Sequence, residues 1–257
     1  MFGKIDFLGL SLKTGNLDEL ADWLISIVRL DSHPSVIVNH INANNYYLLS
    51  QRPELYQKLK NNSYLLLDGI AMKLAVYWLF HRWIPDLNGT DIFPLFMKHL
   101  SEEAIPVYFL GSDKLTIEKA VKRIQNQWHK VNIVGYHSGY FTAADETKIV
   151  RAINNSQAKV LLVGRGFPLQ EEFTLRVRNR LKVALIWNVG GLFDFISENK
   201  QRAPLWMRRW RLEWLFRLAL EPKRLWSRTF VVGPWLAGRI FLAQFERSKR
   251  MWTGDIV

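Results

Sequence analysis

The chain has 257 residues, of which 49% are hydrophobic, which is enough for a full core and too many for a disordered chain. Its 35 Lys and Arg against 23 Asp and Glu give a formal net charge of +12. This charge predicts an acidic partner, such as a phosphorylated substrate, an anionic lipid or a nucleic acid. The absence of cysteine excludes disulfide bonds, thiolate zinc sites and a cysteine nucleophile.

The first 16 residues lack the basic start and the continuous apolar stretch of a signal peptide, so we do not expect secretion. Farther along, short runs of branched side chains recur, with helical patterns between many of them. These runs are SVIVNHI (35–41), YLLLDGI (64–70), VYFLG (107–111), KVLLVG (159–164) and VALIWNVGG (183–191). The alternation predicts an α/β fold with a buried, largely parallel sheet.

Several of these runs end in small or polar residues. They are Asn39 to Asn42, Asp68 with Gly69, Gly111, Gly164 to Gly166, and Gly190 with Gly191. In open α/β sheets, ligands bind beyond the carboxyl ends of the strands. We therefore expect these residues to converge on one crevice.

Asp68 is the best single candidate for acid–base chemistry. It follows an apolar run and precedes Gly69, which predicts an exposed carboxylate beside a tight turn. Read alone, an Asp-Gly pair indicates only a turn, and this alternative stays open.

The segment VLLVGRGFPLQEEF (160–173) has G-x-G directly after a predicted strand, as dinucleotide-binding sites do. Pro168 lies inside the turn and Leu169 takes the place of the third glycine, so a nicotinamide site is disfavoured. Gln170 and Glu171, read alone, are typical of a helix N-terminal cap. The chain contains no Asp-x-Asp pair and no close histidine pair, so we expect no metal site. Arginines, amide dipoles or a helix N-terminus would then hold a departing diphosphate.

The composition changes near residue 200. Residues 202–250 include 12 basic and 3 acidic residues, a net charge of +9, and six of the 11 tryptophans follow residue 205. Trp206, Trp210 and Trp214 have the spacing of one helical face, which predicts either a basic helix on a membrane surface or a core stripe beneath a solvated face. The apolar stretch 229–245 contains an arginine, a proline and two glycines, so we expect it to lie on a bilayer and not to cross it.

Recognisable motifs follow one another over about residues 36 to 228. They are INANNYYLLSQRP (41–53), LLLDGI (65–70), NGTD (88–91), FLGS (109–112), GYF (139–141), GFPLQEEF (166–173), GGLFDF (190–195) and RAPLWMRRWRLEWLFRLALEPKRLW (202–226). Together and in this order they resemble the WecG/TagA/CpsF family of bacterial glycosyltransferases. Its members make enterobacterial common antigen, wall teichoic acid linkage units and capsular or extracellular polysaccharides.

This resemblance implies an inverting, metal-independent transfer of a sugar from a UDP-sugar to a polyprenyl-diphosphate-linked saccharide. It implies a Rossmann-like core, which we place at residues 1–200, and a basic, Trp-rich helical appendage, which we place at residues 201–257. The appendage would help to complete the site at the membrane. We therefore expect a peripheral enzyme on the cytoplasmic face of the plasma membrane, with anionic lipid as a partner and no cofactor.

The resemblance also assigns roles to single residues. Asp68 matches the family's Asp-Gly aspartate, which is considered the general base. The residues that match substrate-side positions are His40, Asn42, Gly111, Gly166, Gln170, Glu171, Asp194, Arg217 and Arg224. Of these, Arg217 and Arg224 match the appendage arginines, which we expect to hold the diphosphate.

Two positions depart from the family pattern. His40 stands where many members carry Thr, two residues before Asn42, and Asp86 stands where many carry Arg, three residues before Gly89. Both positions would lie near the donor in the family's site. The departures favour a branch such as the xanthan glucosyltransferase GumM, which uses UDP-glucose, over transfer of N-acetylmannosamine from its UDP donor.

Two other classes of function remain as alternatives. A basic module that binds RNA or DNA would account for the arginine-rich C-terminal segment. Its aromatic residues recur at helical spacing with Leu and Phe, which favours a bilayer surface, so we expect no nucleic-acid partner. A nucleotide-dependent oxidoreductase would instead bind nicotinamide and have no affinity for UDP.

Overall fold

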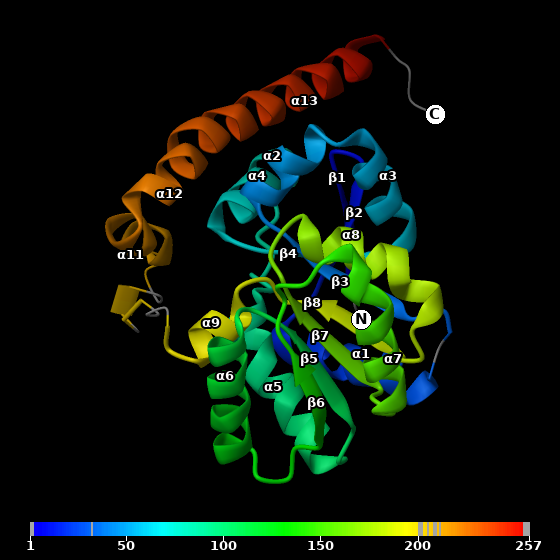
Figure 1. Cartoon of the computed structure of the whole chain (residues 1–257). Helices are drawn as coiled ribbons and strands as arrows, with labels where there is room; N and C mark the ends of the chain where they lie inside the picture. The colour runs from blue at the N-terminus through cyan, green and yellow to red at the C-terminus, as the bar shows by residue number, and fades with distance from the viewer. Residues whose placement is uncertain are drawn as a thin grey trace.

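A computed structural model describes residues 3–31, 33–199, 203–204, 206–207, 210 and 212–253. Its centre is an eight-stranded sheet in the order β1-β2-β4-β3-β8-β7-β5-β6 (Figure 1). The strands are β1 (Gly3–Phe7), β2 (Leu10–Thr14), β3 (Val36–Ile41), β4 (Tyr64–Leu67), β5 (Val107–Gly111), β6 (Ile133–His137), β7 (Val160–Gly164) and β8 (Leu185–Asn188). Neighbouring strands are parallel except for β1 and β2, which pair antiparallel at one edge.

Helices cover both faces of this sheet. They are α1 (Leu17–Leu30), α2 (Ala43–Ser50), α3 (Pro53–Asn62), α4 (Ile70–Phe80), α5 (Gly89–Glu102), α6 (Lys114–Gln127), α7 (Glu146–Asn155), α8 (Leu169–Val177) and α9 (Leu192–Ile196). Helices α1, α5, α6 and α9 pack on one face, and α2, α3, α4, α7 and α8 pack on the other. The prediction of a Rossmann-like α/β fold is confirmed.

The alternation of side chains along the strands explains why both faces are covered. In β4, Leu66 enters one core, while Leu65 and Leu67 enter the core on the opposite face. Every residue of β5 and of β7 is buried, as expected for central parallel strands. Burial on both faces therefore explains the continuous apolar runs in the sequence.

Asparagine and aspartate caps fix where several helices begin near the strand ends. Asn42, directly after β3, accepts a hydrogen bond from the Asn45 amide at 2.9 Å and so caps α2. Asn88 caps α5 through the Asp91 amide at 3.0 Å, and Asp113 caps α6 in the same way. The polar residues that follow the strands thus start helices as well as facing the carboxyl edge of the sheet.

The C-terminal segment is helical and packs on the core. It contains α11 (Glu213–Leu220), α12 (Pro222–Ser227), the π-helical turn η3 (Arg228–Val232) and α13 (Gly233–Thr253), the last drawn orange to red in Figure 1. Leu236 is buried against α2 and α4, and the Trp235 ring lies 5.6 Å from that of Tyr46. No helix of the described residues has both the length and the hydropathy of a membrane span.

The three tryptophans expected on one helical face do not lie on one continuous helix. The Trp210 amide donates to the Trp206 carbonyl at 3.0 Å, but Trp210 is in a turn and Leu212 is not helical. Trp214 belongs to α11, which begins afterwards. The prediction of one helical face was wrong because side-chain spacing does not reveal that the backbone leaves the helical conformation at Leu212.

Candidate active site

The polar and glycine-rich strand ends meet at one edge of the sheet. Parallel pairing sets Ile41 opposite Leu67 and Gly111 opposite Gly164, so the segments that follow these strands leave the sheet side by side. This edge is where open α/β sheets bind ligands. The predicted convergence of these segments is therefore present in the structure.

Asp68 occupies the turn between β4 and α4. Its amide donates to the Ile41 carbonyl of the neighbouring strand at 3.1 Å, and its side chain is half-buried. Gly69 has a φ of +86°, a conformation that other residues adopt only with strain, and α4 starts one residue later. The backbone thus holds the Asp68 carboxylate at the carboxyl edge of the sheet.

A second carboxylate lies beside this turn. Oδ1 of Asp86 accepts a hydrogen bond from the Gly69 amide at 3.0 Å, and the Leu87 amide donates to the Leu67 carbonyl. Burial and the negative charge of Asp68 raise the pKa of Asp86 to about 6, against the opposing effects of the Gly69 amide and Lys73. Two aspartates therefore interact electrostatically at the turn.

Lys73 supplies a positive charge near this pair. It lies on α4, one turn after Gly69, and only 5% of its surface is exposed. A buried lysine requires a compensating charge, and its proximity to Asp86 provides one. The sequence analysis missed Lys73, although a single charge within an otherwise apolar helix is a signal that could have found it.

His40 is half-buried, and its ring is neutral. Trp187 Nε1 donates to His40 Nε2 at 2.9 Å, which leaves the ring proton on Nδ1. Burial lowers the pKa of His40 to about 4, and the Leu87 carbonyl opposes this shift only in part. A Cβ placed on Gly89 would lie 3.4 Å from the same Nε2, so the ring is covered by the first turn of α5. His40 thus supports the floor of the site as an uncharged group.

Gln170 and Glu171 form a buried pair beneath the strand ends. Gln170 Oε1 accepts from the Gly190 amide at 3.1 Å, and its Nε2 donates to Glu171 Oε1 at 2.8 Å. Burial raises the pKa of Glu171 to about 7. Neither side chain caps α8, whose first residues have no side-chain cap. Gln170 therefore orders the glycine turn after β8 and does not act as a helix cap.

Buried amides extend this polar layer. Asn188 Nδ2 donates to Asn39 Oδ1 at 2.6 Å and to Thr174 Oγ1 at 3.0 Å. Among the described residues, Asn39 Nδ2, Asn188 Oδ1 and Glu171 Oε2 are buried and have no hydrogen-bond partner. The sequence analysis did not single out Asn188 or Thr174, although an asparagine at the end of an apolar strand is a detectable signal.

Close backbone packing shapes the other half of the edge. A Cβ on Gly111 would meet the Gly164 carbonyl oxygen at 2.6 Å, and one on Gly164 would meet the Phe193 ring at the same distance. Gly166, in contrast, has a φ of +74° and open space around it. Ser112 Oγ donates to Asp194 Oδ1 at 2.9 Å, which joins the end of β5 to the first turn of α9.

This site can be compared with known proteins. The model of the glycosyl transferase WecG/TagA/CpsF family matches residues 5–250, nearly the whole chain. The chain belongs to this family. A similar protein is the N-acetylglucosaminyldiphosphoundecaprenol N-acetyl-beta-D-mannosaminyltransferase of Bacillus subtilis (strain 168). It is 27% identical over 213 residues, which are 83% of this chain and 82% of that protein.

Membership identifies the chain as a glycosyltransferase and gives Asp86 a particular meaning. Where the family resemblance led us to expect Arg, this glycosyltransferase places the Asp86 carboxylate against the Gly69 amide. The local charge is therefore reversed next to Asp68. His40, the other departure, is hydrogen-bonded within the core and could influence a donor sugar only through the shape of the floor.

Two expected residues of this WecG/TagA/CpsF member cannot be placed in the site. Arg217 belongs to α11 and Arg224 to α12, but their side chains lie outside the described residues. Their assignment to a diphosphate stays a prediction. Within the described ranges, no three His, Asp or Glu side chains are grouped as ligands for a metal ion.

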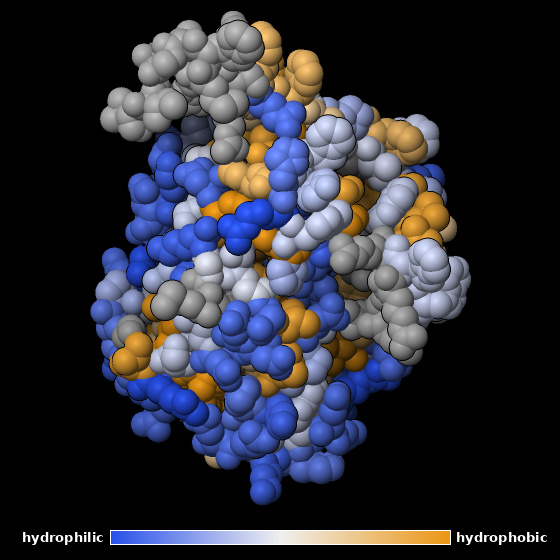
Figure 2. All heavy atoms as spheres, turned by 180° about the vertical axis from the view of Figure 1, so that it is seen from behind, coloured by the Kyte–Doolittle hydropathy of each residue, from blue (hydrophilic) through white to orange (hydrophobic). Residues whose placement is uncertain are grey.

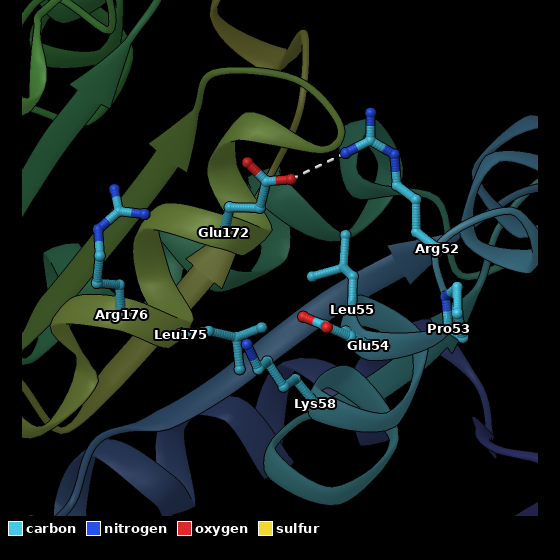
Figure 3. Close-up of a pocket in the computed structure, with 8 residues that line it drawn as sticks. All are labelled: Arg52, Pro53, Glu54, Leu55, Lys58, Glu172, Leu175 and Arg176. Atoms are coloured by element: carbon cyan, nitrogen blue, oxygen red, sulfur yellow. Dashed lines mark hydrogen bonds and ion pairs between the residues drawn. The ribbon is translucent and has the colours of Figure 1, made fainter.

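Two hollows on the surface of this glycosyltransferase lie between helices. One groove of about 690 Å³ runs between α3 and α8 (Figure 3). An ion pair of 3.0 Å between Arg52 and Glu172 closes one side of it. A second hollow, of about 480 Å³, lies among α5, α6 and α9. Neither is lined by Asp68, so we place the active site at the open carboxyl edge.

Proposed function

We propose that this glycosyltransferase transfers one sugar from a UDP-sugar to a polyprenyl-diphosphate-linked saccharide, with inversion at the anomeric carbon. The observation that carries the proposal is the half-buried Asp68, held at the carboxyl edge of a parallel sheet by a glycine turn. The printed name of the Bacillus subtilis relative supports the acceptor class, because it describes a saccharide joined through diphosphate to undecaprenol.

The chemistry needs one base and a means to stabilise the leaving group. Asp68 accepts the proton of the acceptor hydroxyl while the oxygen attacks the anomeric carbon opposite UDP. Inverting transfer requires only this one base at the acceptor hydroxyl, so Asp68 needs no second carboxylic acid as a partner. The negative charge that develops on UDP is met by backbone amides at the strand ends and by Arg217 and Arg224. No step in this scheme requires a metal ion.

The identity of the donor sugar rests on two opposing observations. The name of the Bacillus subtilis relative supports transfer of N-acetylmannosamine. The charge reversal at Asp86, which touches the Asp68 turn, supports a donor without an N-acetyl group, and we propose UDP-glucose. The proposal for the donor therefore rests on this one local difference from the family pattern.

The acceptor places the enzyme at a membrane. We propose that the segment from about residue 202 onward docks on the anionic inner face of the plasma membrane, where its net charge of +9 is attracted. Trp226, Phe230 and Phe241 are each more than half exposed and suit the headgroup boundary. Because Leu236 of α13 is buried in the core, this docking would bring the strand ends close to the lipid.

A donor screen tests the proposal. UDP release would be measured with UDP-glucose and UDP-N-acetylmannosamine, each with polyprenyl-diphosphate-linked mono- and disaccharides, and with each acceptor omitted as the control. We expect acceptor-dependent UDP release, with UDP-glucose preferred. Turnover of UDP-N-acetylmannosamine alone would reject the proposed donor and keep the reaction class. If neither UDP-sugar gave acceptor-dependent UDP release and the protein bound nicotinamide, both the proposed donor and the reaction class would be rejected.

A further inference from the structure

Helix α4 and the loop that follows it expose apolar residues next to α13. Trp78 is 60% exposed and Trp83 is 56% exposed, while Phe241 on α13 is 69% exposed. Gln244 Nε2 donates to the Trp78 carbonyl at 2.6 Å, which fixes the two helices side by side. We call this the α4–α13 surface. It consists of Leu74, Trp78, Trp83, Phe241, Leu242 and Phe245.

The composition of α4 is unusual for a helix at a protein surface. Its sequence, IAMKLAVYWLF, contains one charged residue, Lys73, which is buried. Met72 and Val76 face the core, and Leu74 and Trp78 on the outer side are apolar as well. A surface helix normally carries polar residues on its outer face, and a helix apolar on all sides indicates an apolar environment there. Figure 2, the view from behind, shows hydrophobic (orange) and weakly polar (white to pale blue) side chains exposed toward the top of the molecule.

The charges around the surface indicate what covers it. Residues 69–85 contain no Asp or Glu, and His81 and Arg82 at the end of α4 are exposed. On the C-terminal side, Lys223 and Arg239 are exposed as well, against one exposed acidic residue among those described, Glu246. Tryptophan and tyrosine flanked by basic residues are typical of the interface between a bilayer and water, where anionic headgroups attract the cations.

We propose that the α4–α13 surface docks on an anionic lipid bilayer, so that the catalytic core itself, and not only the C-terminal segment, contacts the membrane. The inference rests on the proposed function in one respect only, namely that a lipid-linked acceptor explains why the catalytic core contacts a membrane. Helix α4 begins two residues after Asp68. Its 11 residues span about 16 Å at the usual helical rise, so the surface is within about one helix length of the base.

Flotation with vesicles tests the surface without any catalysis. The Trp78→Ser/Trp83→Ser double variant would be compared with the native protein on vesicles of phosphatidylglycerol and phosphatidylcholine that contain no acceptor. We expect at least a tenfold loss of binding and a midpoint of thermal unfolding close to the native value. The control is Leu30→Ser, because Leu30 is 76% exposed at the end of α1, on the opposite face of the sheet, and should not affect flotation.

A fluorescent reporter separates lipid contact from unfolding. Because the chain has no cysteine, Trp83→Cys and Leu30→Cys each create a unique site for an environment-sensitive dye. We expect a blue shift at position 83, and none at position 30, when anionic vesicles are added. Unchanged flotation of the double variant together with no shift at position 83 would reject the proposal.

Two further outcomes have defined meanings. A shift at position 83 that depends on protein concentration and needs no vesicles would show that a second copy of the chain covers the surface, and would overturn the inference. If vesicle binding depended on Trp78 and Trp83 but the protein showed no acceptor-dependent UDP release, the docking role of the α4–α13 surface would be supported and the proposed function would be rejected. The two proposals can therefore fail independently.

Discussion

Two aspartates interact at the turn on which the proposed chemistry depends. Asp68 follows β4 directly, and Asp86 reaches the same turn from a loop 17 residues later by accepting the Gly69 amide. Coupled carboxylates do not ionise independently, so the protonation of each depends on the other. The buried Lys73 limits the cost of placing both negative charges there.

Replacing Asp68 tests the base. If it removes the acceptor proton, Asp68→Asn should lower kcat by about 10² to 10⁴, the usual contribution of general base catalysis. Affinity for the UDP-sugar, measured by calorimetry, should stay within a few fold. Near-normal turnover would remove Asp68 from the mechanism, and a large loss of thermal stability would instead favour a role in the turn alone.

Replacing Asp86 tests the coupling. Asp86→Asn keeps an oxygen that can accept the Gly69 amide but removes the carboxyl group whose pKa is raised to about 6 by burial and by the charge of Asp68. If ionisation of Asp86 affects the base beside it, a change of kcat/KM near pH 6 should be present in the native enzyme and absent from the variant. The variant should also gain stability, since the folded-state pKa of Asp86 is raised to about 6 and ionisation above that pH disfavours folding. A pH profile identical to that of the native enzyme would contradict the coupling.

At the scale of elements, the glycine turn at Gly69 joins β4 of the sheet to α4. Ala at position 69 would be strained by about 1 to 3 kcal/mol, because Gly69 has φ +86° and ψ 153°, a conformation that is essentially restricted to glycine. Gly69→Ala should therefore lower the midpoint of thermal unfolding by a few degrees and reduce kcat. The matched control is Gly238→Ala in α13, where the Cβ meets no other atom and a helical alanine should stabilise slightly. Equal effects of the two substitutions would contradict the role of this turn.

The sequence analysis found the elements whose burial leaves a continuous apolar run. It located β3, β4, β5, β7 and β8, because strands buried on both faces are apolar throughout. It missed β1, β2 and β6, which lie toward the edges of the sheet, where half of the side chains are polar. The β1–β2 hairpin turns at Leu8 and Gly9, which have φ values of +50° and +88°. Glycine is typical of such a turn, but leucine before it is not, which weakens the signal.

Only part of the site could be predicted from the sequence. Asp68 was identifiable because a carboxylate beside a glycine follows directly on a strand. Lys73 was detectable as a single charge in an apolar helix, but its partner and that of Trp187 could not be predicted, since both contacts arise only through the fold. The contact of Asp86 with the turn depends on the pairing of Leu87 with Leu67, which sequence spacing does not reveal.

At the scale of the whole molecule, the site should work without a metal ion. Activity measured by UDP release should persist in EDTA, because positively charged side chains and amides are proposed to hold the diphosphate. The control is a metal-dependent transferase assayed in the same buffer. Strict dependence on added Mn²⁺ would contradict this and would show that an acidic group such as Asp68 or Asp86 is a ligand.

The C-terminal segment should divide between lipid contact and substrate contact. Arg217→Ala or Arg224→Ala should keep binding to anionic vesicles and lose turnover with both long-chain and short, soluble acceptors, since a diphosphate charge is left uncompensated. Substitution suits this test better than truncation, because Leu236 is buried and its removal would open the core. If both variants kept full activity, the two arginines would be part of a solvated basic surface only.

Helix α4 also has a consequence for product length. If its outer side rests on lipid, the short rigid helix sets a fixed height of Asp68 above the bilayer. Each transferred sugar moves the new terminal hydroxyl farther from the diphosphate anchor, and so beyond the reach of a base that cannot rise with it. The enzyme should therefore stop after a single addition on each lipid carrier, leaving the next unit to an enzyme whose base stands higher.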